Sequence, residues 1–193
     1  MSTHKIAVVG GDGIGPEVTA EALKVIDATG VTYERVDYDL GAARYLRDGV
    51  VLPDETLDEW RAMDAILLGA VGDPAVGVAA PAGLVERGIL LKMRFELDMY
   101  INLRPFRLPP RIDCEVIREN TEGSYAGEGG FLRKGTMQEI ATQGSVNTRF
   151  GAERCIRYAF EKAMRTERKS LHLIHKKNVL TCAADLVGTT KGR

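Results

Sequence analysis

The sequence lacks the features that would suit a membrane or a nucleic acid. Its longest clearly apolar run, residues 65–68, is far shorter than a membrane-spanning helix requires. The 193 residues carry a formal net charge of −1, with acidic and basic side chains interspersed, so no basic surface for nucleic acid or anionic lipid is expected. The first residues, Met-Ser-Thr-His-Lys, lead directly into a predicted strand, and we expect no signal peptide.

Cysteine is also scarce. Cys114, Cys155 and Cys182 lie far apart and are odd in number, which suits reduced thiols and matches no metal-binding spacing. Hydrophobic residues make up 45% of the chain, a usual share for a protein with a sizeable core. We therefore expect a cytoplasmic globular protein of one domain or two small ones.

Strand and helix patterns alternate along the chain, which predicts an α/β fold with a largely parallel sheet. The predicted strands are residues 5–9, 31–38, 65–68, 100–105, 112–117 and 171–174. Helical spacing of apolar residues predicts helices from Pro16 to Gly30, over 41–48, from Pro53, around Arg94, and over 152–164, where Met164 is expected in the core.

Proline marks a break after the fourth strand. Pro105, Pro109 and Pro110 follow closely on one another, and we place a domain boundary there, giving a first domain of residues 1–104 and a second of 105–193. Within the second, residues 123–135 are rich in glycine and 138–148 are polar and β-branched. This composition predicts a protruding hairpin or arm.

Three arginines lie near predicted element ends: Arg94 on a helix, Arg104 at a strand end, and Arg118 at the end of the next strand. Guanidinium presents a planar fork of donors that matches a carboxylate, so convergence of the three would indicate a site for a small polycarboxylate. The apolar turn at residues 89–91 would lie beside it. The alternative is three separately solvated arginines, and spacing alone leaves both open.

The glycine-rich turn at residues 10–15 follows a strand and precedes a helix. Read from Gly11, it does not match the dinucleotide fingerprint G-x-G-x-x-G, because the last glycine would fall on Pro16. Asp37 and Asp39 lie where a ribose-binding acid would be, so a Rossmann dehydrogenase stays open beside a merely tight turn.

Two further side chains could transfer protons. Lys176 follows a predicted buried strand, where desolvation could lower its pKa and make it a base. Tyr125 could be a general acid or simply a loop aromatic. Neither residue indicates catalysis by itself.

The motifs in combination are more specific. They are Gly-Asp-Gly-Ile-Gly-Pro-Glu at 11–17, Arg94 followed by Asn-Leu-Arg-Pro at 102–105, Arg-Glu-Asn-Thr-Glu-Gly at 118–123, and Lys-Lys-Asn-Val-Leu at 176–180. Over residues 5 to about 186 the sequence resembles the β-decarboxylating dehydrogenases, the isocitrate and isopropylmalate dehydrogenase family, and it looks most like the members that act on 3-isopropylmalate. The resemblance implies that family's fold, which is not a Rossmann fold: two α/β domains, the first incomplete in this chain, with an arm in the second.

The resemblance also implies residue roles. Arg94, Arg104 and Arg118 would bind the carboxylates of a malate. Tyr125 and Lys176 would be the acid/base pair, with Lys176 chosen over its neighbour because Asn178 completes the family pattern Lys-x-Asn. The apolar Leu90 and Leu91, next to Ile89, would suit an isopropyl group, since a third carboxylate there would lose its hydration without a partner.

For the cofactor, the resemblance implies NAD with Mg²⁺ or Mn²⁺. The residues expected near NAD are Ile14, Asn178 and the loop of Gly69, Ala70, Val71, Gly72 and Asp73. The metal ligands stay unassigned, because the expected carboxylates would follow the lysine segment and this chain offers only Asp185 there.

The implied activity is oxidative decarboxylation of 3-isopropylmalate to 2-oxoisocaproate with NAD, in leucine biosynthesis. The lysine would serve the neighbouring subunit's site, so a homodimer is implied. Two departures, a short link between residues 107 and 112 and a chain that ends soon after Lys176, lead us to expect a truncated sequence or a fragment. The alternatives are a D-malate or tartrate type of decarboxylating dehydrogenase, or a non-catalytic relative that binds a carboxylate or a partner chain.

Overall fold

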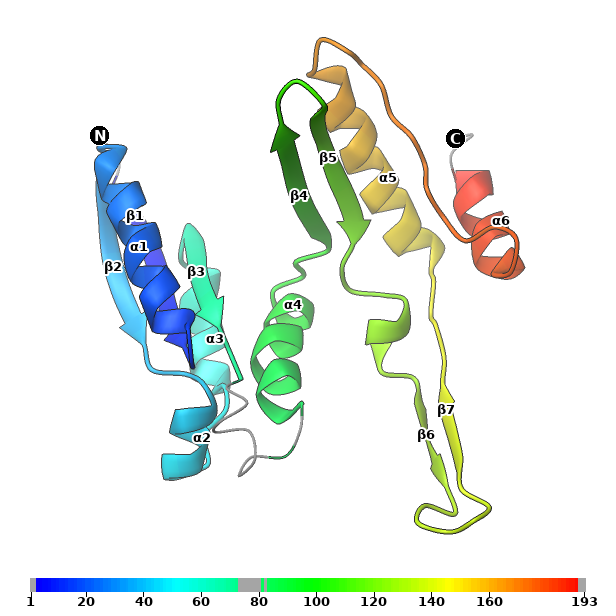
Figure 1. Ribbon diagram of the computed structural model, residues 1–193, viewed down its shortest axis with the longest axis horizontal. Coiled ribbons are helices and arrows are strands. Elements are labelled where there is room, and N and C mark those ends of the chain that lie inside the picture. The colour runs from blue at the N-terminus through cyan, green and yellow to red at the C-terminus, as the bar shows by residue number, and fades with distance from the viewer. Residues whose placement is uncertain (1–2, 73–80, 82, 191–193) are drawn as a thin grey trace. The chain divides into compact units, whose positions relative to one another are not determined.

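The computed structural model describes residues 3–72, 81 and 83–190, and the chain divides into two compact units, Met1–Leu97 and Asp98–Arg193 (Figure 1). The predicted boundary after Arg104 falls inside strand β4 (Ile101–Leu108). Pro105 does not end this strand as predicted. β4 pairs only with β5 among the described residues, and an edge position tolerates a residue without an N–H.

Unit 1 is built on a small parallel sheet. Its strands are β1 (His4–Gly11), β2 (Tyr33–Tyr38) and β3 (Ala65–Ala70), in the order β2-β1-β3. Ala7, Val8 and Val9 of the central strand are fully buried, as expected for a strand covered on both faces. The prediction of a parallel sheet is confirmed for this unit.

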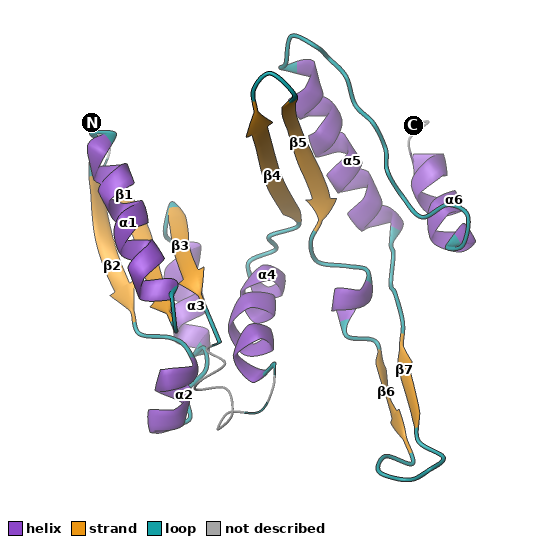
Figure 2. Ribbon diagram, viewed as in Figure 1, coloured by secondary structure: helices purple, strands orange, loops and turns teal. Residues whose placement is uncertain are grey.

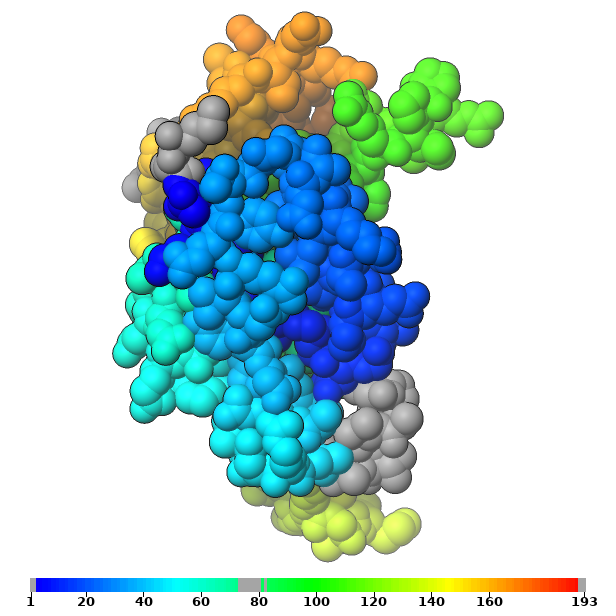
Figure 3. Space-filling model, turned by 90° about the vertical axis from the view of Figure 1, so that its left-hand side faces the viewer, coloured from blue at the N-terminus to red at the C-terminus, as the bar shows by residue number. Residues whose placement is uncertain are grey.

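Helices complete unit 1. α1 (Gly15–Ala28) packs against β1 and β3, and the other helices are α2 (Ala42–Asp48), α3 (Asp54–Arg61) and α4 (Lys92–Glu96). Gly49 ends α2 in the left-handed conformation, at φ 74°, which glycine adopts without steric penalty. α4 continues directly from a π-helical turn, Glu86–Leu91. Figure 3 shows the side of the unit where α1 and β2 face the viewer.

The described residues of unit 2 form two antiparallel hairpins and two helices (Figure 2). β4 pairs with β5 (Ile112–Glu119), and β6 (Gly129–Leu132) pairs with β7 (Ile140–Gln143). The helices are α5 (Arg149–Met164) and α6 (Thr181–Thr190), with a short 3₁₀ turn at Ser124–Ala126. The predicted hairpin is present, and every residue of β6 and β7 is exposed, as in an arm.

Helix α5 covers one face of the β4–β5 sheet. The Lys162 Nζ lies 3.1 Å from the Glu115 Oε2, and the Arg154 Nη2 lies 3.9 Å from the Glu119 Oε1. Thr148 caps the helix, because its Oγ1 accepts a hydrogen bond from the Gly151 N–H at 3.0 Å. Odd-numbered residues of β5 therefore face α5, and even-numbered ones face away from it.

Two predictions for unit 2 are wrong. Residues 171–174 form no strand and are exposed, with Ile174 at 92%, because no described strand pairs with them. The alternation of apolar residues there indicated a strand, but a strand also needs a hydrogen-bonding neighbour. Met164, expected in the core, lies at the exposed end of α5. No helix in the described part of the chain has the length and apolar character that crossing a membrane requires.

Candidate functional site

The β4–β5 ladder places Arg104 and Arg118 on one face of the sheet. Asn102 lies opposite Arg118, and Arg104 lies opposite Val116. Because opposite residues and residues two apart share a face, the two guanidinium groups are diagonal neighbours on the side away from α5. The pairing thus brings two of the three predicted carboxylate-binding arginines together.

Two asparagines connect these arginines in a polar row. The Arg104 Nε donates to the Asn102 Oδ1 at 2.8 Å, and the Asn102 Nδ2 donates to the Asn120 Oδ1 at 3.3 Å. The same Asn120 oxygen accepts from the Arg118 Nη2 at 3.2 Å. The row therefore fixes the direction of both guanidinium groups.

Asn120 is the anchor of this row. It is only 5% exposed, its Nδ2 donates to the Met99 carbonyl and its backbone N–H donates to the Tyr100 carbonyl, both at 3.0 Å. The sequence motifs contain both asparagines, but they do not by themselves indicate a role for either. The spacing of two residues from Arg104 and from Arg118 was the available signal, because in an extended chain it puts an asparagine on the same face as each arginine.

The Nε of Arg118 is buried and has no hydrogen-bond partner within the described residues. A buried donor without an acceptor is unusual in a protein and costs stability. Arg118 and the exposed Arg104 together give this face a positive charge. The arrangement suits a carboxylate.

Tyr125 lies next to Arg118. The Arg118 Cζ is 5.2 Å from the centre of the Tyr125 ring, within the range of a cation–π contact. Gly123 and Val146 exchange two backbone hydrogen bonds of 2.7 and 3.2 Å, which hold the turn that carries the tyrosine. Tyr125 is 44% exposed.

Arg94, Leu90 and Leu91 belong to unit 1. The two leucines precede the arginine by four and three residues on one continuous helical segment, so they lie on the same side of it. Both leucines are half-buried, whereas Ile89 is fully buried and cannot touch a ligand as part of the predicted apolar turn. That Arg94 meets the arginines of unit 2 stays a prediction.

The residues predicted to approach NAD lie at the ends of β1 and β3. Ile14 is 67% exposed and directly precedes α1. Gly69 and Ala70 end strand β3 and are not part of a loop, and a side chain at Gly69 would come within 2.2 Å of the Gly10 carbonyl oxygen. Val71 and Gly72 continue the chain, and Asp73 lies outside the described residues.

Asp12, to which sequence reasoning gave no role, joins these segments. Its carboxylate is 6% exposed and accepts hydrogen bonds from the N–H groups of Ala42 at 2.7 Å, Ala43 at 3.1 Å and Gly72 at 3.0 Å. It thereby satisfies two N–H groups at the start of α2, where a negative charge is favourable, and ties the chain after β3 to the glycine-rich turn. In the sequence, the one indication of this role was the presence of an acidic residue within a glycine-rich turn.

Lys176 and Asn178 are both exposed, on an irregular segment before α6. The expectation of a buried strand end at Lys176 is wrong, because residues 171–174 are not a strand. The Lys176 carbonyl accepts from the Leu180 N–H at 3.0 Å, while its side chain makes no hydrogen bond or ion pair to the described residues. Within the described part of the chain no group of three His, Cys, Asp or Glu residues could hold a metal ion.

The chain resembles known proteins over almost its whole length. The family model described as isocitrate/isopropylmalate dehydrogenase matches residues 5–191. The 3-isopropylmalate dehydrogenase of Frankia casuarinae is 54% identical over 196 residues, covering 96% of this chain and 56% of the relative. That of Corynebacterium glutamicum strain R is 58% identical over 186 residues, covering 91% and 54%.

Solved structures agree with these relatives. The isocitrate dehydrogenase of Methylococcus capsulatus has a TM-score of 0.80 at 36% identity, covering 98% of this chain and 56% of that one. A β-decarboxylating dehydrogenase of Thermococcus kodakarensis has a TM-score of 0.70 at 34% identity, covering 98% and 55%. The chain spans about half the length of the proteins that it matches.

Proposed function

Because the chain belongs to the isocitrate/isopropylmalate dehydrogenase family, we propose that it takes part in the NAD-dependent oxidative decarboxylation of 3-isopropylmalate to 2-oxoisocaproate. This reaction belongs to leucine biosynthesis and would take place in the cytoplasm. The observation that carries the proposal is the polar row, in which Arg104 and Arg118 share one face with Tyr125 beside them. A malate has two carboxylates, and two guanidinium forks supported by asparagines suit their recognition.

The residues have different roles in the reaction. Arg104 and Arg118 hold the substrate carboxylates, and we assign the same ligand to Arg94. Lys176 accepts the proton of the substrate hydroxyl as the hydride leaves for NAD from the carbon that bears this hydroxyl. The resulting β-keto acid loses carbon dioxide, and Tyr125 donates its phenolic proton to the carbon that carried the lost carboxylate.

The described residues include a suitable surface for NAD but no suitable site for the metal ion. When bound, NAD supplies the hydride acceptor, and the exposed Ile14 offers an apolar surface for the approach of a flat ring. Enzymes of this family use a dinucleotide and a divalent metal ion. The described residues contain no carboxylate cluster that fits Mg²⁺ or Mn²⁺, and no step above depends on that ion.

The substrate is an alkylmalate because Leu90 and Leu91 are the apolar side chains on the same side of the helix as Arg94. The direct test is NADH formation from 3-isopropylmalate, isocitrate, D-malate and tartrate. We expect 3-isopropylmalate to give the highest kcat/KM. Equal turnover of isocitrate would contradict the pocket assignment, and a preference for D-malate or tartrate would move the protein to that type of enzyme.

The carboxylate role of Arg104 has its own test. Arg104→Lys keeps the charge but loses the planar fork, and a charge-assisted hydrogen bond contributes about 1.5–3 kcal/mol. Calorimetry should then show about ten-fold or more weaker binding of 3-isopropylmalate. Arg107→Lys is the matched control, since Arg107 lies on the same strand and the opposite face. Equal affinity in the two variants would exclude Arg104 from the site.

We also propose that the protein works as a homodimer. The β6–β7 arm supports this, because all its residues are exposed and they include Phe131, Leu132 and Ile140. Burying such side chains against a second copy would stabilise both. Light scattering should give twice the monomer mass, and Phe131→Ser with Leu132→Ser should reduce it to the monomer value.

A further inference from the structure

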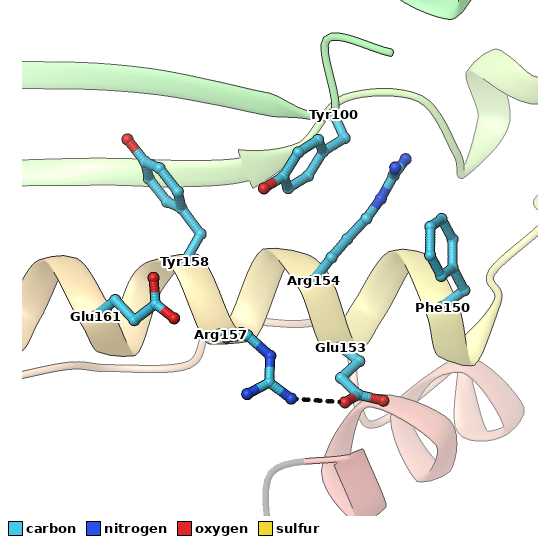
Figure 4. Close-up of a pocket in the computed structure, with 7 residues that line it drawn as sticks. All are labelled: Tyr100, Phe150, Glu153, Arg154, Arg157, Tyr158 and Glu161. Atoms are coloured by element: carbon cyan, nitrogen blue, oxygen red, sulfur yellow. Dashed lines mark hydrogen bonds and ion pairs between the residues drawn. The ribbon is translucent and has the colours of Figure 1, made fainter.

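Arg154 lies on α5 with its guanidinium group between two aromatic rings (Figure 4). The Arg154 Cζ is 4.4 Å from the centre of the Tyr100 ring and 4.6 Å from that of Phe150. Its side chain is 17% exposed, so its interactions are little screened by solvent. Two ring faces on one guanidinium hold its plane in a single orientation.

The same guanidinium connects the two segments that lie side by side at the open end of the β4–β5 hairpin. The Arg154 Nη1 donates to both carboxylate oxygens of Asp98, at 2.7 and 2.8 Å. The Nη2 donates to the Thr121 Oγ1 at 2.9 Å, and that hydroxyl donates in turn to the Glu119 carboxylate at 2.6 Å. One side chain therefore fixes the chain just before β4 and just after β5.

These are the segments on which the polar row depends. Asn120 lies between Glu119 and Thr121, and it bonds to the carbonyl groups of Met99 and Tyr100. Any shift of residues 98–100 against 119–121 would move the Asn120 amide, and with it the oxygen that orients Arg118. Arg154 holds both segments from the α5 side, while the arginines project from the other side.

We propose that Arg154 is a positioning residue for substrate binding, which acts through Asn120 on Arg118 from behind the sheet. The inference rests on the proposed function for its ligand, but its geometry lies entirely within unit 2. Lysine cannot replace the arginine, because its ammonium group has no planar fork that could stack between two rings while separate nitrogens bond to Asp98 and Thr121.

The first test measures the position of Asn120 without any ligand, by hydrogen exchange of backbone amides followed by NMR. In Arg154→Lys the Asn120 amide should exchange at least ten-fold faster than in the unmodified protein, whereas Leu23, in the middle of α1 in unit 1, should change less than two-fold. Arg157→Lys is the matched control, because Arg157 is one turn away and, among the described residues, its ion pair is with the exposed Glu153, at 2.8 Å.

A milder variant keeps the test decisive if Arg154→Lys unfolds the unit. Asp98 has a φ of 47°, and asparagine adopts this left-handed conformation readily, so Asp98→Asn removes the ion pair without straining the backbone. The Asn120 amide should again exchange faster. If neither variant speeds its exchange beyond the Arg157→Lys control, the proposal is overturned.

The second test measures binding of 3-isopropylmalate. Arg154→Lys should weaken it at least five-fold in the unmodified background and less than two-fold when Arg118 is already lysine, because the effect passes through Arg118. Equal losses in both backgrounds would show that Arg154 acts only on general stability and would overturn the proposal. If the unmodified protein does not bind 3-isopropylmalate, the proposed function fails, and the exchange experiment still decides the role of Arg154.

Discussion

Replacement of Asp12 offers the sharpest test of how unit 1 is held together. Its Oδ2 accepts from the N–H groups of Ala42 and Gly72, and its Oδ1 accepts from that of Ala43. In Asp12→Asn the amide keeps one acceptor oxygen of the same size. Its NH₂ group then points at a backbone N–H, so at least one bond becomes a contact between two donors.

The expected loss in the free energy of unfolding follows from the number of hydrogen bonds that each variant loses. A hydrogen bond to a charged group contributes about 1.5–3 kcal/mol, so Asp12→Asn should lower the free energy of unfolding of unit 1 by about 2 kcal/mol. Asp12→Ala removes all three acceptor contacts, one of them buried and two partly buried, and should cost about 3–5 kcal/mol. Domains are stable by only about 5–15 kcal/mol, so the second change approaches complete unfolding.

The chain carries its own probe for this measurement. Trp60 is the only tryptophan, it is 2% exposed, and it lies on α3 within unit 1. Its fluorescence in urea should show the midpoint of Asp12→Asn lowered by about 1 M, since small proteins lose about 1–3 kcal/mol per molar urea. Asp58→Asn, at an exposed site on α3, is the control. A midpoint equal to that control would refute the assigned role of Asp12.

Four other predictions concern catalysis and thiol chemistry. Leu90→Ser should erode the preference for 3-isopropylmalate over D-malate several-fold in kcat/KM, because apolar contact contributes about 25 cal/mol per Å² buried; an unchanged ratio would remove it from the pocket. Lys176→Met should lower kcat by about 10²–10⁴-fold, and if only Lys177→Met does so, the assignment is off by one residue. Tyr125→Phe should reduce overall decarboxylation more than hydride transfer. Stopped-flow measurement of NADH gives the rate of hydride transfer separately from that of product release, and equal losses in the two rates would contradict the place of Tyr125 in the last step. Burial raises the pKa of the Cys155 thiol to about 11, helped by the nearby Glu119 carboxylate, so the unreactive protonated form prevails at pH 8 and mass spectrometry should find Cys155 unalkylated by iodoacetamide until urea unfolds the protein.

The sequence predicted the elements of unit 1 well, because each carries its own local signal. The apolar run at Ala7–Val9 indicates a buried strand, Pro16 the first turn of a helix, and Gly49 a helix end. Unit 2 was harder, since pairing decides its structure. Pro105 lies within a strand because a neighbouring strand pairs with that segment. Residues 171–174 form no strand because no described strand pairs with them, so the presence of a neighbour outweighs the local sequence pattern.

The site was predictable to the extent that motif and strand period determine it. Alternation alone places Arg104 with Asn102 on one face of a strand, but only the pairing register shows that Arg118 lies opposite that asparagine. The roles of Asp12 and Arg154 depend on contacts across thirty or more residues. No local pattern specifies such contacts, so the sequence could not reveal them.

The antiparallel register of β4 and β5 also restricts which changes in chain length this protein tolerates. Adding or removing one residue from each strand near the tip, at residues 109–111, would lengthen or shorten the hairpin and leave Asn102 opposite Arg118. A single residue inserted into one strand would instead form a bulge, or would turn Arg118 toward α5. Insertions and deletions at this tip should therefore survive in evolution as matched pairs or within the turn itself.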